Sequence, residues 1–170
     1  ELWVSGTLGD ARLALGALRG EWALPAPALA LARQRLERPT PRLALGQALR
    51  GIASSAIDIS DGLVGDVGHI LKASGMGAEI DASIASKLIA VGNLLTPASG
   101  LFDSKTLQAA ALAGGDDYEL AFTAPPGARA AVERAAAQAA TRVTRNGRIT
   151  AQAGLRALDD AGADVILCRA

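Results

Sequence analysis

The sequence predicts an α/β domain in which helices are layered on a β-sheet. Segments with helical periodicity alternate with segments of strand periodicity along the chain, which is typical of layered α/β domains. The chain has 170 residues, enough for one domain with a substantial core, so we expect residues 1–170 to form a single domain. Half of the residues are apolar but only 3% are aromatic, so Ala, Leu, Val and Ile are expected to build the core.

Composition and charge narrow the classes of partner. Lys plus Arg and Asp plus Glu both number 17, and no concentrated basic face is visible, which argues against nucleic acid as a partner. No apolar run approaches the roughly 20 residues that span a bilayer, and no signal peptide is evident at the start of the sequence. The single cysteine, Cys168, suits a reducing compartment, so we expect a cytoplasmic protein without membrane contact.

The first third of the chain predicts one strand and three helical segments. A strand is expected over residues 2–6, and residues 8–18 carry apolar side chains at helical spacing. Residues 21–36 contain Pro25 and Pro27, which are expected to end one helix and open another. A further helix is expected over residues 42–52.

The middle of the chain predicts a strand over residues 56–60 and a helix that begins at residue 61. Glycines in residues 74–77 are expected to end that helix. A strand over 78–81 and a helix over 106–113 follow. The helix from residue 61 places its apolar side chains on one face, at Leu63, Val64, Val67, Ile70 and Leu71.

The last third predicts a strand over residues 116–124 and an Ala-rich helix over 128–140. Residues 142–150 are expected to form a β-hairpin, because the Asn146-Gly147 pair suits the positive φ angles of a tight turn. Two further β segments are expected over 154–159 and 164–168.

The stretch "AIDISDG" places two carboxylates close together at a strand end. Capping of the following helix explains Ser60 or Asp61, because either side chain can accept a free backbone N–H. Capping does not explain Asp58, which we interpret as a carboxylate that points inward from an apolar strand and therefore requires solvent, a partner or a cation. Asp58 and Asp61 can converge on Mg²⁺, and the adjacent helix N-terminus attracts phosphate oxygens. This arrangement suits phosphoryl transfer.

A second stretch, "GGDDYEL", repeats this chemistry. Gly114 and Gly115 allow the backbone to turn or to approach a ligand closely, and Asp116 and Asp117 follow directly. A solvated turn and a substrate contact both remain open for these two carboxylates.

Together the two motifs resemble the thiamine-monophosphate kinases. The resemblance rests on "AIDISDGLVGDVGHILKASGMGAEID" followed by "GGDDYELAFTAP", with "LWVSGTLGDARLAL" and "RLALGQALRG" in the same order. It implies a three-layer α/β sandwich of the α+β type, with a mixed sheet and partial ferredoxin-like topology. It also implies an ATP-dependent kinase that phosphorylates thiamine monophosphate to thiamine diphosphate with Mg²⁺.

The resemblance assigns roles to individual residues. Asp58 and Asp61 become Mg²⁺ ligands, Ser60 becomes a nucleotide contact, and Asp116 becomes a contact of thiamine monophosphate. No further catalytic residue is assigned, since positioning and charge neutralisation supply most of the rate in phosphoryl transfer.

The sequence also departs from the family. Its members carry an N-terminal ATP-binding domain, which holds most Mg²⁺ ligands and the dimer interface, and an aromatic C-terminal segment. Neither is found in these 170 residues, so we expect a C-terminal, substrate-side domain that is inactive alone and part of a homodimer when full length. Two alternatives are a non-catalytic binding or regulatory module of the same fold and another ATP-dependent enzyme of the same superfamily.

Overall fold

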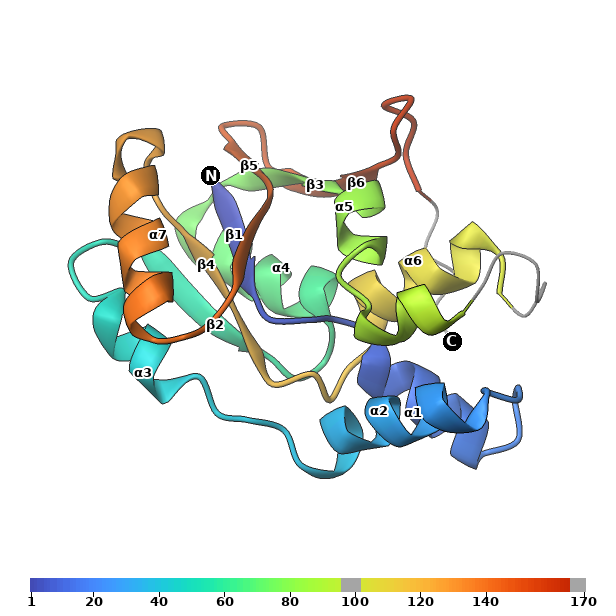
Figure 1. Cartoon of the computed structure of the whole chain (residues 1–170). Coiled ribbons are helices and arrows are strands. Elements are labelled where there is room, and N and C mark those ends of the chain that lie inside the picture. Colours follow the sequence, from blue (N-terminus) through green and yellow to red (C-terminus); the bar gives the residue numbers. More distant parts are fainter. Residues whose placement is uncertain (96–101, 166–170) are drawn as a thin grey trace.

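The computed structural model describes residues 1–95 and 102–165 as a six-stranded sheet with helices on both faces (Figure 1). The predicted strand over 164–168 and Cys168 lie largely outside the described residues. The strands are β1 (Leu2–Ser5), β2 (Ser55–Ile59), β3 (Gly77–Asp81), β4 (Glu119–Thr123), β5 (Val143–Thr150) and β6 (Gly154–Leu158). The helices are α1 (Asp10–Leu18), α2 (Ala26–Glu37), α3 (Leu43–Ala48), α4 (Leu63–Ser74), α5 (Ala82–Ser86), α6 (Ser104–Ala113) and α7 (Arg129–Gln138), with 3₁₀ turns η1 (Ala90–Leu94) and η3 (Pro126–Ala128).

The sheet is mixed, as expected. Its strand order is β2-β4-β1-β5-β3-β6, which makes β2 an edge strand. All neighbouring pairs are antiparallel except β3 and β6, which are parallel. The partial ferredoxin-like topology stays a prediction.

Two hydrophobic clusters lie on opposite faces of the sheet and give the molecule three layers. Side chains alternate between the faces along each strand, so Leu2 and Val4 of β1 face one cluster while Trp3 faces the other. Helices α3 and α7 cover the Trp3 face, and helices α4, α5 and α6 cover the opposite face (Figure 1). Helices α1 and α2 pack against each other, and α1 also contacts α6. The three-layer α+β prediction is confirmed.

Helix α4 follows the predicted apolar pattern. Its buried apolar side chains Leu63, Val67 and Leu71 recur every four residues and form one stripe against the sheet. Gly75 ends the helix in the left-handed region with φ 65°, a conformation that favours glycine. The predicted boundaries of this helix are therefore close to the observed ones.

The predicted hairpin at Asn146-Gly147 is wrong. Residues Val143–Thr150 form one continuous strand, β5, which pairs with β1 on one side and β3 on the other. Leu2 pairs with Gly147 and Trp3 pairs with Arg145, so Asn146 is the extra residue of a β-bulge. A Cβ on Gly147 would lie 2.2 Å from the carbonyl oxygen of Glu79, so this glycine permits close strand packing and not a turn.

No helix within the described residues is long and apolar enough to cross a membrane.

Candidate functional site

Asp58 lies on the exposed side of the edge strand β2, which corrects our expectation that it points inward. Ile57 and Ile59 pack on the α4 side of the sheet, so the alternating Asp58 faces the other way and is exposed. This carboxylate reaches solvent at the mouth of a cavity on that face of the sheet. Among the ion pairs of the described residues, none involves Asp58 or Asp61.

Neither Ser60 nor Asp61 caps helix α4, so the capping prediction is wrong. The N-cap residue is Gly62, with φ 112°, and it has no side chain to accept a hydrogen bond. Instead, the carboxylate of Asp66 reaches back from the first turn of the helix. One of its oxygens accepts hydrogen bonds from the backbone N–H groups of Ser60 and Asp61, both at 3.0 Å. The side chains of Ser60 and Asp61 are therefore not engaged in capping.

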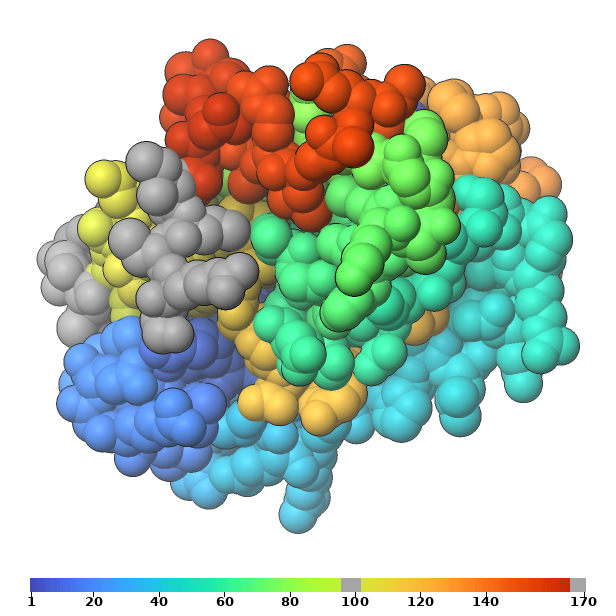
Figure 2. Space-filling model, turned by 180° about the vertical axis from the view of Figure 1, so that it is seen from behind, coloured from blue at the N-terminus to red at the C-terminus, as the bar shows by residue number. Residues whose placement is uncertain are grey.

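The second acidic motif lies against the first. The N–H of Asp116 donates to the carbonyl oxygen of Ser60 at 2.9 Å, and the N–H of Tyr118 donates to the carbonyl oxygen of Ile59 at 2.8 Å. A Cβ on Gly115 would lie 2.5 Å from the Ser60 oxygen, so only glycine allows this approach. Figure 2 shows the yellow-orange surface of this segment beside the green surface around α4. The fold thus joins two motifs that are separate in the sequence.

The backbone of residues 116–118 adopts a conformation that L-residues rarely take. Asp116 has φ 66° and Tyr118 has φ 50°, and neither is glycine. Strand β4 consequently begins at Glu119 and not at residue 116 as predicted. Such strained residues persist where surrounding contacts fix them, and they cluster at functional sites.

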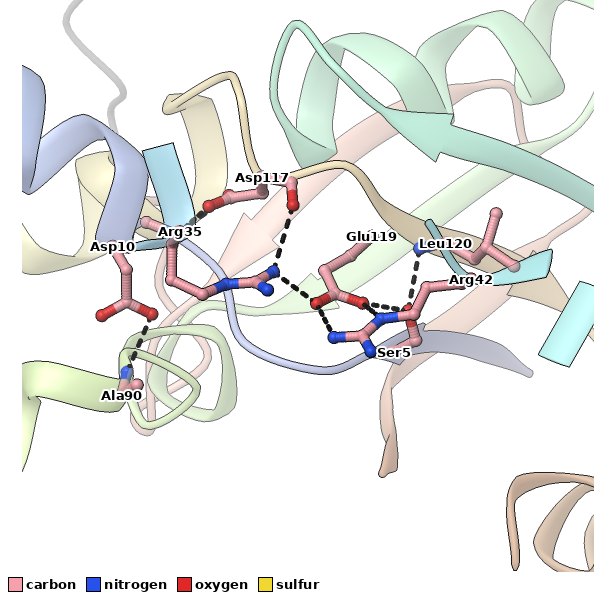
Figure 3. Close-up of polar contacts among 9 residues, drawn as sticks. Ser5, Asp10, Arg35, Arg42, Ala90, Asp117, Glu119 and Leu120 are labelled. Carbon is pink, nitrogen blue, oxygen red and sulfur yellow. Dashed lines mark hydrogen bonds and ion pairs between the residues drawn. The ribbon is translucent and has the colours of Figure 1, made fainter. Parts of the chain in front are cut away.

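A buried ion cluster lies beneath this loop (Figure 3). The Glu119 side chain is fully buried and accepts hydrogen bonds from Arg35 at 2.6 Å, from two nitrogens of Arg42 at 2.6 and 2.7 Å, and from the Ser5 hydroxyl at 2.5 Å. Arg35 also donates to the carbonyl oxygen of Asp117 at 3.1 Å. The hydrogen bond from Arg42 to Glu119 raises the pKa of the Arg42 guanidinium.

Two further buried carboxylates adjoin this cluster. Asp117 accepts the N–H of Gly9 on both of its oxygens, at 2.9 and 3.0 Å. Burial raises the pKa of Asp117 well above its usual value, and the neighbouring Asp10 acts in the same direction. Burial also raises the pKa of Asp10, which accepts the N–H groups of Ala90 and Val91. Both carboxylates are used to hold backbone in place.

A cavity of about 530 Å³ opens beside the joined motifs. It lies between helix α3 and the exposed side of β2 and β4. Apolar side chains supply much of its wall, and charged and amide groups supply the rest, as in many sites for small molecules. The lining residues are Pro39, Pro41, Arg42, Leu43, Gly46, Gln47, Arg50, Asp58, Tyr118 and Leu120.

A larger cavity, about 600 Å³, lies near strands β3 and β5. Most of its acidic residues already have partners within the chain: Glu1 pairs with Arg145, Glu79 pairs with Arg148, Asp81 caps helix α5, and Asp159 accepts two backbone N–H groups of its own turn. Both acidic motifs lie elsewhere, so we place the candidate site at the smaller cavity.

The candidate site offers hard oxygen ligands but an incomplete set. The Asp58 and Asp61 carboxylates and the Ser60 hydroxyl are donors of the type that Mg²⁺ prefers. The described residues contain no group of three or more His, Cys, Asp or Glu side chains arranged to hold a metal. The donor chemistry therefore fits Mg²⁺, with the remaining ligands to come from water, phosphate or another part of the protein.

Comparison with known proteins finds relatives of this chain, although no protein-family model matches it. It is 42% identical to the thiamine-monophosphate kinase of Salmonella typhimurium over 151 residues, which are 88% of the chain and 44% of that protein. The chain is a homologue of the thiamine-monophosphate kinases. It spans less than half the length of this relative.

Solved structures of thiamine-monophosphate kinases share the fold. The crystal structure from Stenotrophomonas maltophilia K279a matches with a TM-score of 0.79 and 39% identity, over 92% of this chain and 49% of that one. The structure of AaThiL complexed with AMPPCP and TMP matches with a TM-score of 0.73 and 30% identity, over 97% of this chain and 48% of that one.

The residues that the resemblance to thiamine-monophosphate kinases singled out lie in this one region. Asp58, Ser60 and Asp61 follow one another at the end of β2, and the loop that carries Asp116 is hydrogen-bonded to them. Sequence reasoning missed Asp66, Arg35 and the buried Glu119. Charged residues within otherwise apolar segments were the one sequence signal that could have indicated them, since a buried carboxylate requires a partner.

Proposed function

We propose that this chain is the substrate-side, C-terminal domain of a thiamine-monophosphate kinase. The observation that carries the proposal is the hydrogen bond between Asp116 N–H and Ser60 carbonyl oxygen, which joins the two acidic motifs at one cavity. The homology over most of the chain and the nucleotide analogue and TMP in the AaThiL complex support this function. The reaction would phosphorylate thiamine monophosphate to thiamine diphosphate at the expense of ATP.

The roles of the site residues follow from their chemistry. Asp58 and Asp61 would hold Mg²⁺, which neutralises phosphate charge when bound. Ser60 would contact the nucleotide, and its position before the N-terminus of α4 supports this role. Asp116 would orient thiamine monophosphate.

The chain's contribution to the transfer is positioning. An oxygen of the thiamine monophosphate phosphate would attack the γ-phosphorus of ATP, and the bond from that phosphorus to the β–γ bridging oxygen would break to release ADP. The two hydrogen-bonded loops that carry the acidic motifs would hold the reactants in line. Such positioning supplies most of the rate enhancement in phosphoryl transfer.

The proposal extends to the whole protein. The chain covers less than half of its relatives' length, which supports an ATP-binding domain N-terminal to it and a domain that is inactive alone. We also propose a homodimer when full length and a cytoplasmic location, which the family resemblance and the single cysteine support.

The test is formation of thiamine diphosphate from ATP, Mg²⁺ and thiamine monophosphate by the protein as its gene encodes it. Asp61→Asn is expected to lower kcat at fixed Mg²⁺, and Asp116→Asn to raise KM for thiamine monophosphate. Asp103→Asn is the matched control, because Asp103 caps the far end of the ten-residue helix α6. Equal turnover in all three variants would reject these assignments, and turnover by the 170 residues alone would reject the need for a second domain.

A further inference from the structure

Arg35 contacts both the strained acidic loop and the first residue of the strand that follows it. It lies in the last turn of α2, with only 15% of its side chain exposed. A single nitrogen, Nη2, donates to the Glu119 carboxylate at 2.6 Å and to the Asp117 carbonyl oxygen at 3.1 Å (Figure 3). Arg35 thus ties the start of strand β4 to the loop before it.

The loop needs such ties because its backbone is strained. Asp116 and Tyr118 flank Asp117 and both have positive φ angles. A conformation of this kind persists only when the surrounding contacts over-determine it. Four residues outside the loop hold it: the carbonyl groups of Ile59 and Ser60, the N–H of Gly9, and the guanidinium of Arg35.

Glu119 does not depend on Arg35 for its charge partner. Two nitrogens of Arg42 and the Ser5 hydroxyl also donate to its carboxylate, independently of Arg35. The contribution that Arg35 makes alone is the hydrogen bond to the Asp117 carbonyl oxygen. We therefore expect the loss of Arg35 to alter the conformation of the loop more than the charge balance of the buried Glu119.

We propose that Arg35 is a positioning residue that holds the 116–118 loop in the conformation that presents Asp116 and Tyr118 to the substrate. This inference rests on the proposed function. Tyr118 lines the cavity and Asp116 lies two residues before it in the same loop, so a shift of the loop changes the shape of the substrate site without touching the reacting phosphates.

The test compares Arg35→Met with Arg33→Met in the protein as its gene encodes it. Arg33 is the matched control, because it lies on the same helix and pairs with Glu37 at the surface. Loss of one charge-assisted hydrogen bond corresponds to roughly tenfold, so Arg35→Met is expected to raise KM for thiamine monophosphate about tenfold with little change in kcat. Arg35→Lys is expected to recover part of this loss, since an ammonium group also donates to carbonyl and carboxylate oxygens.

Hydrogen exchange of the Asp116 and Tyr118 amides gives a readout that does not depend on activity. We expect faster exchange of both amides in Arg35→Met and parental exchange in Arg33→Met. Unchanged exchange and KM in Arg35→Met, or equal losses in kcat and kcat/KM, would overturn the inference. If the parent makes no thiamine diphosphate, the proposed function fails, and the exchange rates still decide whether Arg35 holds the loop.

Discussion

The backbone N–H of Asp116 donates a 2.9 Å hydrogen bond to the carbonyl oxygen of Ser60. This contact joins two acidic motifs that lie more than fifty residues apart in the sequence. The Asp66 carboxylate holds the same Ser60 peptide from the other side, through the Ser60 and Asp61 amides. The candidate site is therefore a backbone junction whose exposed side chains remain available to a ligand.

Asp66→Ala is predicted to destabilise the protein by about 1–3 kcal/mol, because it leaves two N–H groups without their acceptor. Asp66→Asn retains a side-chain oxygen at the same position, so we expect a smaller loss of stability. Urea unfolding monitored by circular dichroism measures both variants. Equal stability of Asp66→Ala and the parent would show that these hydrogen bonds do not hold the turn.

Glu119→Gln is predicted to destabilise the protein by about 3–5 kcal/mol, since it removes the buried charge that two arginines share. Glu79→Gln is the control, because Glu79 pairs with the largely exposed Arg148, and we expect a loss below about 1 kcal/mol. Denaturant midpoints of the two variants give the comparison. Similar losses would mean that the buried cluster contributes no more than a surface ion pair.

Asp117 predicts a specific pH dependence of stability. Its pKa is raised above 3.8 by burial, so the folded state binds the proton more tightly than the unfolded state does. Its contribution to stability is fully present below the unfolded pKa and is lost as pH rises through the folded pKa. Carboxylates titrate at about pH 4 and above. The free energy of unfolding should therefore fall more steeply for the parent than for Asp117→Asn as the pH rises from about 4 to about 7.

Asp103 supplies the opposite case as a control. Its pKa is lowered by hydrogen bonds from Thr106, so its contribution is present above the unfolded pKa and lost as pH falls through the folded one. Asp103→Asn should remove a pH dependence of the opposite sign. Parallel curves for the parent and Asp117→Asn would contradict the role that burial plays at Asp117.

Gly115→Ala is predicted to destabilise the protein by about 1–3 kcal/mol, because the new methyl group would be forced against the Ser60 carbonyl oxygen. Gly68→Ala is the matched control on helix α4, where a Cβ meets no atom within 4 Å and alanine favours the helix. Thermal unfolding distinguishes the two changes, with a lower Tm for the first and a higher Tm for the second. A stable Gly115→Ala protein would show that the two motifs can move apart at little cost.

Local patterns predicted most of the elements of this fold. The buried residues of α4 recur at helical spacing, and Gly75 ends the helix as its position indicated. Asn146-Gly147 misled because the same dipeptide suits a turn and a bulged strand, and only pairing with β1 and β3 decides between them. The direction of Asp58 depended on which face of β2 packs against α4, which is a property of the tertiary fold and not of local sequence.

The sequence predicted the residues of the two acidic motifs but not the buried ion cluster beneath them. Asp58, Ser60, Asp61 and Asp116 stood out because acids and glycines cluster at element ends. Glu119 meets Arg35 and Arg42 across 84 and 77 residues of sequence, so no local spacing signals the buried cluster. The positive φ angles of Asp116 and Tyr118 likewise arise from long-range contacts.

The most direct test of a single joined site is a double-mutant cycle with Asp61→Asn and Asp116→Asn. The measured quantity is kcat/KM for thiamine monophosphate in the formation of thiamine diphosphate by the gene-encoded protein. If the two motifs act in one site, each single change lowers kcat/KM, and the double change departs from additivity by at least about 0.5 kcal/mol. Additive losses, or a parental kcat/KM in either single variant, would contradict the account.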